Sequence, residues 1–513
     1  MPVRGGALAL LIATILPALA PAAPAVPAPA PPRVGLVPLD ERPVNLSDVL
    51  ALGTLAGGEL VTPPRYRLGH GDAEGDADGI AEWLDSLDLT KITSLVVSTD
   101  MLAYGGLPAS RRPDTTVEKA LARMKAIERL HARATSVHIY AFTTLPGLSL
   151  GDDGRRGAWR TALMRWAELG GPDAADPQAA AEARSIESQI PTTMFDRYKA
   201  LRARNLAVAK AAADLVAAGT IDYLALSAEP EEPRGVVAAE RTTLTSALGS
   251  SMSSHRAALV TGADPLGTLL VARALAVPGR AIAVDVVPAS GAPQVESALR
   301  ASLDVAALSP PPRGARADAV CVIYTGRDDG AAAAGEKVAR ALAAGSRVSA
   351  ADVGAPGAGA SIPFIEALRV RHAFQKLAGF SAGDAPIAIA RALTAAAISR
   401  DDAASRLARE QVLLQRLAVD FVYAAIVRPQ AMDDYLQPHQ IDPAHLDADQ
   451  ARRTEAYLME QVKPLVENLI SDVGAARRLK PGPNAVRDVN DFTLKLSWGR
   501  LDEVEIGFTL TAP

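Results

Sequence analysis

The sequence has few cysteines, few aromatic residues and no excess of basic charge. A single cysteine among 513 residues excludes a disulfide within the chain. This residue, Cys321, lies in the apolar run 319–324, so we interpret it as a small buried residue rather than a nucleophile. Lysine and arginine number 53 against 58 acidic residues. This balance disfavours nucleic-acid binding, because proteins that bind nucleic acids present a basic face.

The sequence also lacks the common patterns for metals and organic cofactors. Its seven histidines form no HxxxH pair, and no cysteine pair exists, so we predict no metal centre, although a carboxylate-bound magnesium or calcium ion stays open. No GxGxxG fingerprint follows a strand, so we expect no nicotinamide or flavin cofactor. Residues 379–383 match the GxSxG pattern of serine hydrolases, but no suitable Asp and His follow them.

The N-terminus has the pattern of an export signal. Arg4 precedes an apolar stretch, residues 7–20, that is too short to span a bilayer comfortably. Residues 21–32 are rich in Ala and Pro, which is typical of an extended tether. We therefore interpret residues 1–33 as an export signal and tether of a periplasmic or extracellular protein, with an uncleaved membrane anchor as the weaker alternative. No later segment resembles a transmembrane helix.

Short apolar runs alternate with Ala-rich helical stretches from residue 34 to about residue 400. The expected strands are 34–39, 59–61, 95–99, 137–142, 223–226, 257–260, 281–287, 319–324 and 348–351. The expected helices are 117–132, 200–218, 240–248, 266–276, 336–344 and 387–397. This alternation predicts an α/β fold with parallel sheets and helical crossovers. We favour doubly wound sheets over an elaborated β/α barrel, because the strands exceed eight and are unevenly spaced.

The pattern changes after residue 400, so we separate residues 401–513 from the α/β region, which itself divides into two lobes near 250–280. Asp402 can cap a helix that runs to about Val427. A second long helix is expected over 447–470. Residues 491–497 and 503–510 alternate with a period of two, which predicts an antiparallel pair at the C-terminus.

Carboxylates follow two of the expected strands directly. The first strand ends in Asp40, Glu41 and Arg42, with Asn45 shortly after them, and the strand over 95–99 ends in Asp100. One carboxylate can serve as a general acid or base while Arg42 holds an anion or the other carboxylate. The structural alternative is an Asp–Arg ion pair that fixes the loop. We interpret Asp40, Glu41 and Asp100 as the catalytic candidates.

Further polar residues stand at similar positions and are candidates for substrate binding. Tyr104 can stack on a sugar face, and Gly105 permits a positive φ or close approach of a ligand. Alternatively, Tyr104 fills a gap in the core, Asp100 caps the next turn, and Asp264 caps a helix. The full set of binding candidates from the residues alone is Arg42, Asn45, Tyr104, Gly105, Arg111, Asp264, Asp285 and Asp352.

Three segments resemble a bacterial family known as domain of unknown function 4127. They are residues 39–45, residues 98–107 and residues 202–205, and the similarity covers nearly the whole mature chain. The third segment adds Arg204 and Asn205 to the binding candidates. The resemblance implies a shared architecture, and it carries over no established activity. The chain departs from the family pattern at residues 228–231, at Pro265 and at residues 380–381.

Two functions follow as expectations. The first is an exported hydrolase that acts on a carbohydrate, because glycoside cleavage requires paired carboxylates. The second is a non-catalytic periplasmic or surface protein that binds a sugar or polyol between two lobes, which the departures from the family pattern favour. In both cases the expected partner is a small molecule or glycan, with no nucleic acid and no membrane beyond the possible anchor. The sequence leaves the oligomeric state open.

Overall fold

The computed structural model describes residues 32–511 except for 72, 151–156, 230–233, 277–279, 288–292, 327, 356, 401 and 479–487. The predicted export signal and tether therefore lie outside the described residues, apart from Pro32 and Arg33. None of the helices in the described ranges combines the length and the apolar character that crossing a bilayer requires.

The N-terminal half builds a parallel sheet, which we call the first sheet. Its strands are β1 (Arg33–Val37), β2 (Glu59–Val61), β3 (Ser94–Ser98), β4 (His138–Leu145), β5 (Tyr223–Ala228) and β6 (Ala257–Thr261). They lie in the order β2-β1-β3-β4-β5-β6, and Val37 stands opposite Val97 in the pairing of β1 with β3. The strand order reverses between β1 and β3, which is where open α/β sheets place their ligands.

The second sheet is also parallel and open. Its strands are β7 (Ile282–Val287), β8 (Ala319–Tyr324), β9 (Arg347–Val353) and β10 (Leu377–Gly383), in the order β10-β9-β8-β7. Two open sheets confirm the α/β class with parallel strands and helical crossovers, and they exclude the alternative of one barrel. The nine expected strands are all present, but the sequence did not indicate β10. At Gly379 this strand has no room for a side chain, because Ala395 of α15 lies where a Cβ would stand.

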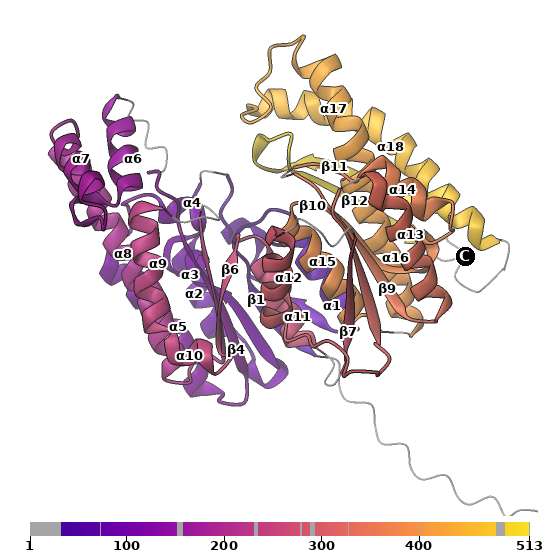
Figure 1. The fold of residues 1–513 in the computed structure, drawn as a ribbon, viewed down its shortest axis with the longest axis horizontal. Coiled ribbons are helices and arrows are strands. Elements are labelled where there is room, and N and C mark those ends of the chain that lie inside the picture. The colour runs from indigo at the N-terminus through magenta and orange to yellow at the C-terminus, as the bar shows by residue number, and fades with distance from the viewer. Residues whose placement is uncertain are drawn as a thin grey trace, which may run out of the picture. The chain divides into compact units, whose positions relative to one another are not determined.

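Helices connect the strands and continue after the second sheet (Figure 1). Those of the first half are α1 (Ser47–Leu55), α2 (Ala77–Ser86), α3 (Thr99–Tyr104), α4 (Leu107–Ser110), α5 (Val117–Arg133), α6 (Trp159–Leu169), α7 (Pro177–Glu187), α8 (Thr192–Ala217), α9 (Gly235–Ala247) and α10 (Gly249–Ser253). Those of the second half are α11 (Pro265–Leu275), α12 (Pro293–Val305), α13 (Asp328–Ala343), α14 (Ile362–Arg369), α15 (Ala385–Ile398), α16 (Ala403–Leu417), α17 (Arg428–Ala431) and α18 (Ala448–Arg478).

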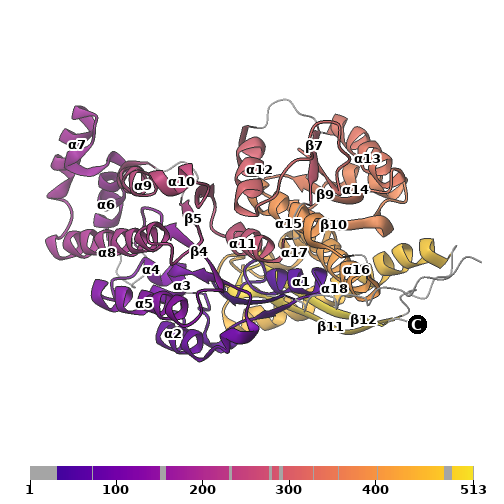
Figure 2. The same cartoon turned by 90° about the horizontal axis from the view of Figure 1, so that it is seen from below.

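The two sheets are joined by helices that are apolar on nearly all sides. Helix α11 packs on β1, β3 and β4 of the first sheet and also against α15, which covers the second sheet (Figure 2). Leu266 in α11 and Leu393 in α15 are completely buried. One apolar cluster contains these leucines together with Leu36 of β1 and Ile323 of β8. The Ala-rich composition of α15 is explained by this position, since small side chains let helices approach closely.

The C-terminal region packs against the second sheet. Asp402 caps α16 by accepting a hydrogen bond from the Ser405 amide, as predicted. The chain then continues without a break through a π-helical stretch, Ala418–Val427, α17 and a second π-helical stretch, Met432–Leu436, so the expected end near Val427 is wrong. The last two strands, β11 (Asp488–Leu496) and β12 (Val504–Thr511), form the predicted antiparallel pair.

Candidate functional site

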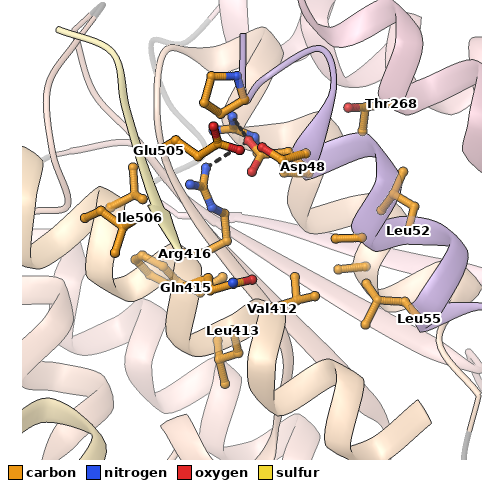
Figure 3. A pocket seen from close by; sticks show the side chains of 18 of the residues that line it. Asp48, Leu52, Leu55, Thr268, Val412, Leu413, Gln415, Arg416, Glu505 and Ile506 are labelled. Carbon is orange, nitrogen blue, oxygen red and sulfur yellow. Dashed lines mark hydrogen bonds and ion pairs between the residues drawn. The ribbon is translucent and has the colours of Figure 1, made fainter. Parts of the chain in front are cut away.

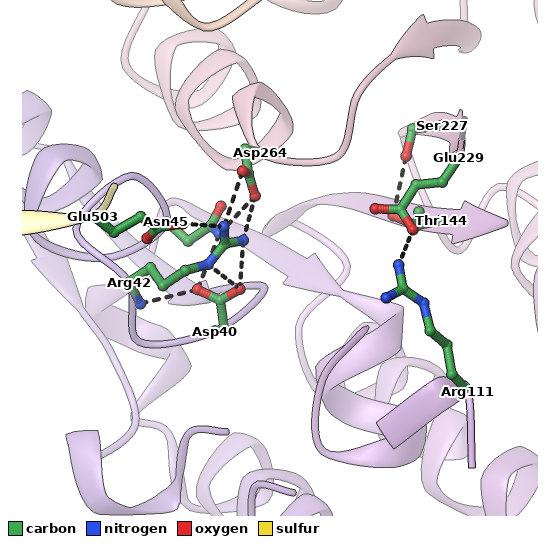
Figure 4. Close-up of polar contacts among 9 residues, drawn as sticks. All are labelled: Asp40, Arg42, Asn45, Arg111, Thr144, Ser227, Glu229, Asp264 and Glu503. Atoms are coloured by element: carbon green, nitrogen blue, oxygen red, sulfur yellow. Dashed lines mark hydrogen bonds and ion pairs between the residues drawn. The ribbon is translucent and has the colours of Figure 1, made fainter. Parts of the chain in front are cut away.

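Arg42 lies at the centre of a polar cluster beyond the end of β1 (Figure 4). Its Nε and Nη2 donate to Oδ2 of Asp40 at 3.0 and 2.8 Å. Its Nη2 also donates to Asp264 at 2.5 Å, and its Nη1 donates to Glu503 at 2.8 Å. Asn45 Nδ2 donates to both Asp40 and Asp264 at 3.0 Å. We call these five residues the Arg42 cluster.

The Arg42 cluster holds together three parts of the chain that are far apart in the sequence. Asp40 follows β1, Asp264 precedes α11, and Glu503 lies between β11 and β12. Asp264 stands at the N-cap position of α11, but its carboxylate makes no capping hydrogen bond. The alternative that this carboxylate caps the helix is therefore wrong. Burial raises the pKa of Asp40, and Arg42 partly offsets this shift. With both of its oxygens bonded and 1% exposure, Asp40 is suited to holding Arg42 in place.

Asp100 occupies a different environment at the end of β3. Ser98, not Asp100, caps α3 by accepting a hydrogen bond from the Met101 amide at 3.2 Å. The Asp100 carboxylate accepts a hydrogen bond from the Thr144 amide of β4 at 3.0 Å, and it is only 1% exposed. Burial raises the pKa of Asp100 to about 7, and the nearby charge of Glu229 adds to the shift. This carboxyl group can therefore hold a proton near neutral pH.

Glu229 provides a second carboxylate, close enough for its charge to act on the pKa of Asp100. It follows β5 directly and forms an ion pair with Arg111 (Figure 4). The side chains of Glu229 and Arg111 are 31% and 30% exposed, so this end of the site opens to solvent. Ser227 Oγ donates to Thr144 Oγ1 at 3.0 Å, which continues the polar contacts from β5 to β4. We call Asp100, Arg111, Thr144, Ser227 and Glu229 the Asp100 site.

The Asp100 site contains three residues that sequence reasoning did not select. Glu229 was noticed only as a departure from the family pattern, and Thr144 and Ser227 were not considered. Glu229 carries the same pattern as Asp40 and Asp100, an acid placed directly after a buried strand, so this pattern could have identified it. Thr144 and Ser227 lie within apolar strands, and only the pairing of β4 with β5 shows that they face each other.

Arg204 and Asn205 lie in α8 and are both buried. The Arg204 guanidinium donates to the carbonyl oxygens of Ser110, Arg112 and Thr115 at 2.6 to 2.9 Å. Asn205 donates to the same Ser110 carbonyl at 2.9 Å. Their donors therefore attach α8 to the chain around α4. Tyr104 is buried in the core, with its ring 4.6 Å from the Arg204 guanidinium carbon.

Gly105 ends α3 in the left-handed region, with a φ of 88°. A Cβ at this position would collide with the carbonyl oxygen of Gly75, whose amide donates to Gly105 at 2.8 Å. Glycine is therefore required here both for its φ and for the close approach of two backbones.

We expect Gly105→Ala to lower the free energy of unfolding by more than about 1 kcal/mol, since alanine is strained at positive φ and the collision adds to that cost. Urea denaturation would measure the loss. Gly219→Ala is the control, because Gly219 also has positive φ but no atom lies within 4 Å of the position that a Cβ would take there. Equal losses in the two variants would show that the contact with Gly75 has no effect.

The remaining predicted residues lie outside both clusters. Asp285 is on β7, the edge strand of the second sheet, and accepts a hydrogen bond from Lys337 at 2.9 Å. Asp352 is the second-last residue of β9 and accepts a hydrogen bond from the Ser361 amide at 2.6 Å. Burial raises the pKa of Asp352 to about 6. Glu41 pairs with Arg65 and His70 on the outer side of the β1 loop.

The structure therefore divides the predicted site. It brings Asp40, Arg42, Asn45 and Asp264 together in the Arg42 cluster. It places Asp100 and Arg111 in the Asp100 site, where Arg111 pairs with Glu229. The two sites lie at neighbouring strand ends of the first sheet. No group of three or more acidic, histidine or cysteine side chains within the described ranges is arranged to hold a metal ion.

A pocket of about 220 Å³ separates the strand ends of the two sheets. Asp264 and Glu503 of the Arg42 cluster line one side of it. Gly383 and Asp384, which follow β10, and Tyr423 of the π-helical stretch also line it. The Arg42 cluster thus forms part of the wall of this pocket, which we call the intersheet pocket.

Comparison with known proteins identifies the family but adds no activity. No curated protein matches the chain. One family model, described as a protein of unknown function (DUF4127), matches residues 34–507, which include both sheets, the Asp100 site and nearly all of the C-terminal region. The chain therefore belongs to the DUF4127 family.

Proposed function

We propose that this protein is an exported hydrolase that cleaves a carbohydrate by acid–base catalysis at the Asp100 site. The observation that carries the proposal is the buried carboxyl group of Asp100, whose pKa of about 7 lets it hold a proton at neutral pH, next to the more exposed Glu229. Glycoside cleavage requires one protonated and one ionised carboxyl group. Export is supported by the N-terminal residues 1–33.

The two carboxyl groups take different roles because their surroundings differ. Asp100 is buried and donates its proton to the leaving oxygen, while Glu229, partly exposed, acts as the base or nucleophile. Arg111 orients Glu229 through their ion pair. The Thr144 amide fixes the position of the Asp100 carboxyl group. This assignment replaces Asp40 and Glu41 as partners of Asp100, because Asp40 is bound within the Arg42 cluster and Glu41 faces Arg65 and His70.

We expect Asp100→Asn and Glu229→Gln each to lower kcat by at least about 100-fold on a glycan that the wild type cleaves, which is the usual contribution of acid–base groups. A panel of oligosaccharides and aryl glycosides, assayed for released reducing sugar, would identify that glycan. In the wild type, kcat/KM should fall as the pH rises above about 7, because Asp100 then loses its proton.

The matched control is Asp285→Asn, which removes a carboxylate on the edge strand β7 of the second sheet. Its kcat should stay within about twofold of the wild type, since Asp285 lies on the second sheet, paired with Lys337, whereas the Asp100 site lies on the first sheet. Unchanged turnover in both Asp100→Asn and Glu229→Gln would refute the proposed catalytic pair.

The intersheet pocket favours a second candidate function, the binding of a sugar or polyol without catalysis. Its volume of about 220 Å³ and its mixed polar lining suit a small hydroxylated ligand. A thermal-shift screen separates the two functions. Stabilisation by a glycan with no product formed supports binding, whereas product formation supports the hydrolase.

A further inference from the structure

A second cavity, of about 120 Å³, lies deeper between the two halves of the chain (Figure 3). It is bounded by α1, by β10 and α15, by α16 and by β12. We call it the α1–α16 cavity. Protein interiors contain few voids larger than a water molecule. A cavity of about 150 Å³ with apolar walls is known to accept benzene, so this one has room for a ligand with a short aliphatic group.

One end of the α1–α16 cavity is apolar. Leu52 and Leu55 of α1 face Val412 and Leu413 of α16 across it, and Ile506 of β12 closes the side (Figure 3). Leu52, Leu55 and Leu413 are each at most 5% exposed. Such walls contribute no hydrogen bonds, so a branched aliphatic group suits this end better than water does.

The other end of the cavity is charged and contains two guanidinium groups together with the carboxylates of Asp48 and Glu505 (Figure 3). Arg391 of α15 and Arg416 of α16 both bond Oδ2 of Asp48, Arg416 at 3.2 Å. Arg416 also lies 3.5 Å from Asp420. No acceptor among the described residues reaches the Nε of Arg391, although this atom is buried. A buried N–H donor without a partner is uncommon and costly.

We propose that the α1–α16 cavity binds a short-chain aliphatic monocarboxylate. Its carboxylate accepts the free N–H of Arg391, and its branched tail lies among Leu52, Leu55 and Val412. A guanidinium group binds carboxylates more strongly than neutral acceptors, because its hydrogen bonds are charge-assisted. The cavity shares Asp48, Arg391 and Arg416 with the wall of the intersheet pocket but extends away from it. The inference does not depend on the proposed hydrolysis.

The probe for this site is 3-methylbutanoate, whose four-carbon tail matches the apolar end. Isothermal titration calorimetry on the full chain should show saturable binding. The isosteric 3-methylbutanamide should bind at least about tenfold more weakly, since it carries no charge. Val412→Phe fills the apolar end, and Arg391→Gln removes the donor, so each should weaken binding of the acid at least about tenfold.

The controls keep the test independent of folding. Val370→Phe and Arg300→Gln make the same replacements at exposed positions and should bind the acid like the wild type. Arg391→Gln also breaks the ion pair with Asp48. If Arg391→Gln fails to fold, Val412→Phe decides the question, because it keeps every charge. Ile387→Phe is a further control, because Ile387 lines the intersheet pocket and not the α1–α16 cavity.

Three results would overturn the proposal. The first is the absence of saturable binding of 3-methylbutanoate to the folded wild type at millimolar concentration. The second is unchanged affinity in Val412→Phe. The third is weaker binding in Ile387→Phe but not in Val412→Phe, which would place the acid in the intersheet pocket.

Discussion

Asp100→Asn should stabilise the protein above pH 7, and the size of the effect follows from the raised pKa of the carboxyl group. Folding shifts this pKa from 3.8 to about 7. At pH 8 the folded wild type carries a buried charge. At about 1.4 kcal/mol per pKa unit, this charge lowers the free energy of unfolding by about 4 kcal/mol relative to pH 3. The neutral amide of Asn avoids this cost and can still accept the hydrogen bond from Thr144.

The sign can be followed through the pH range. The folded pKa of Asp100 is raised, so its contribution to stability is complete below pH 3.8 and is lost as the pH rises towards 7. The difference in free energy of unfolding between Asp100→Asn and the wild type should therefore grow by about 4 kcal/mol from pH 3 to pH 8. Urea denaturation at several pH values measures it.

Asp285→Asn is again the control, because Asp285 is partly exposed and paired with Lys337. Its stability difference from the wild type should vary by less than about 1 kcal/mol over the same range. A pH-independent difference for Asp100→Asn would mean that folding does not raise the pKa of Asp100, so that the group is ionised at neutral pH. That result would also remove the proposed catalytic acid.

Arg42→Ala should destabilise the protein by about 3–5 kcal/mol at pH 7, the usual cost of removing one partner of a buried ion pair. Arg42 bonds three carboxylates, those of Asp40, Asp264 and Glu503. Burial lowers the pKa of Arg42, but these three negative charges outweigh it and hold the pKa well above the ordinary value. Without the guanidinium, the carboxylates repel one another with no counter-charge.

The defect of Arg42→Ala should become smaller in acid. Burial raises the pKa of both Asp40 and Glu503, so both groups lose their charge more readily as the pH falls. Urea denaturation at pH 4 and pH 7 would show the difference. Arg500→Ala is the matched control, since the guanidinium groups of Arg42 and Arg500 both lie over the Trp498 ring, at 4.7 and 5.6 Å from its centre, and Arg500 bonds no carboxylate of the cluster. A loss in Arg42→Ala no larger than in Arg500→Ala would show that the cluster adds no stability.

The pattern of apolar runs identified nine of the ten parallel strands, because strands buried on both faces are continuous runs of apolar residues. Strand β10 does not show this pattern and was not predicted. Its residues Gly379, Ser381 and Gly383 interrupt the apolar run, and Gly379 has no room for a side chain because Ala395 of α15 packs against it. The requirement for a small residue comes from α15, which follows β10 in the chain, so the residues of β10 alone do not indicate a strand.

The sequence by itself determined the fold class and the presence of polar residues at strand ends, since both depend on local periodicity. Only the tertiary structure decided which of these residues meet. Arg42 joins Asp40 to Asp264 and Glu503 across more than two hundred residues of chain, whereas Asp100 is bonded to Thr144 and feels the charge of Glu229. Strand order and the path of α11 set these contacts. Both result from packing between segments far apart in the chain, which local patterns do not record.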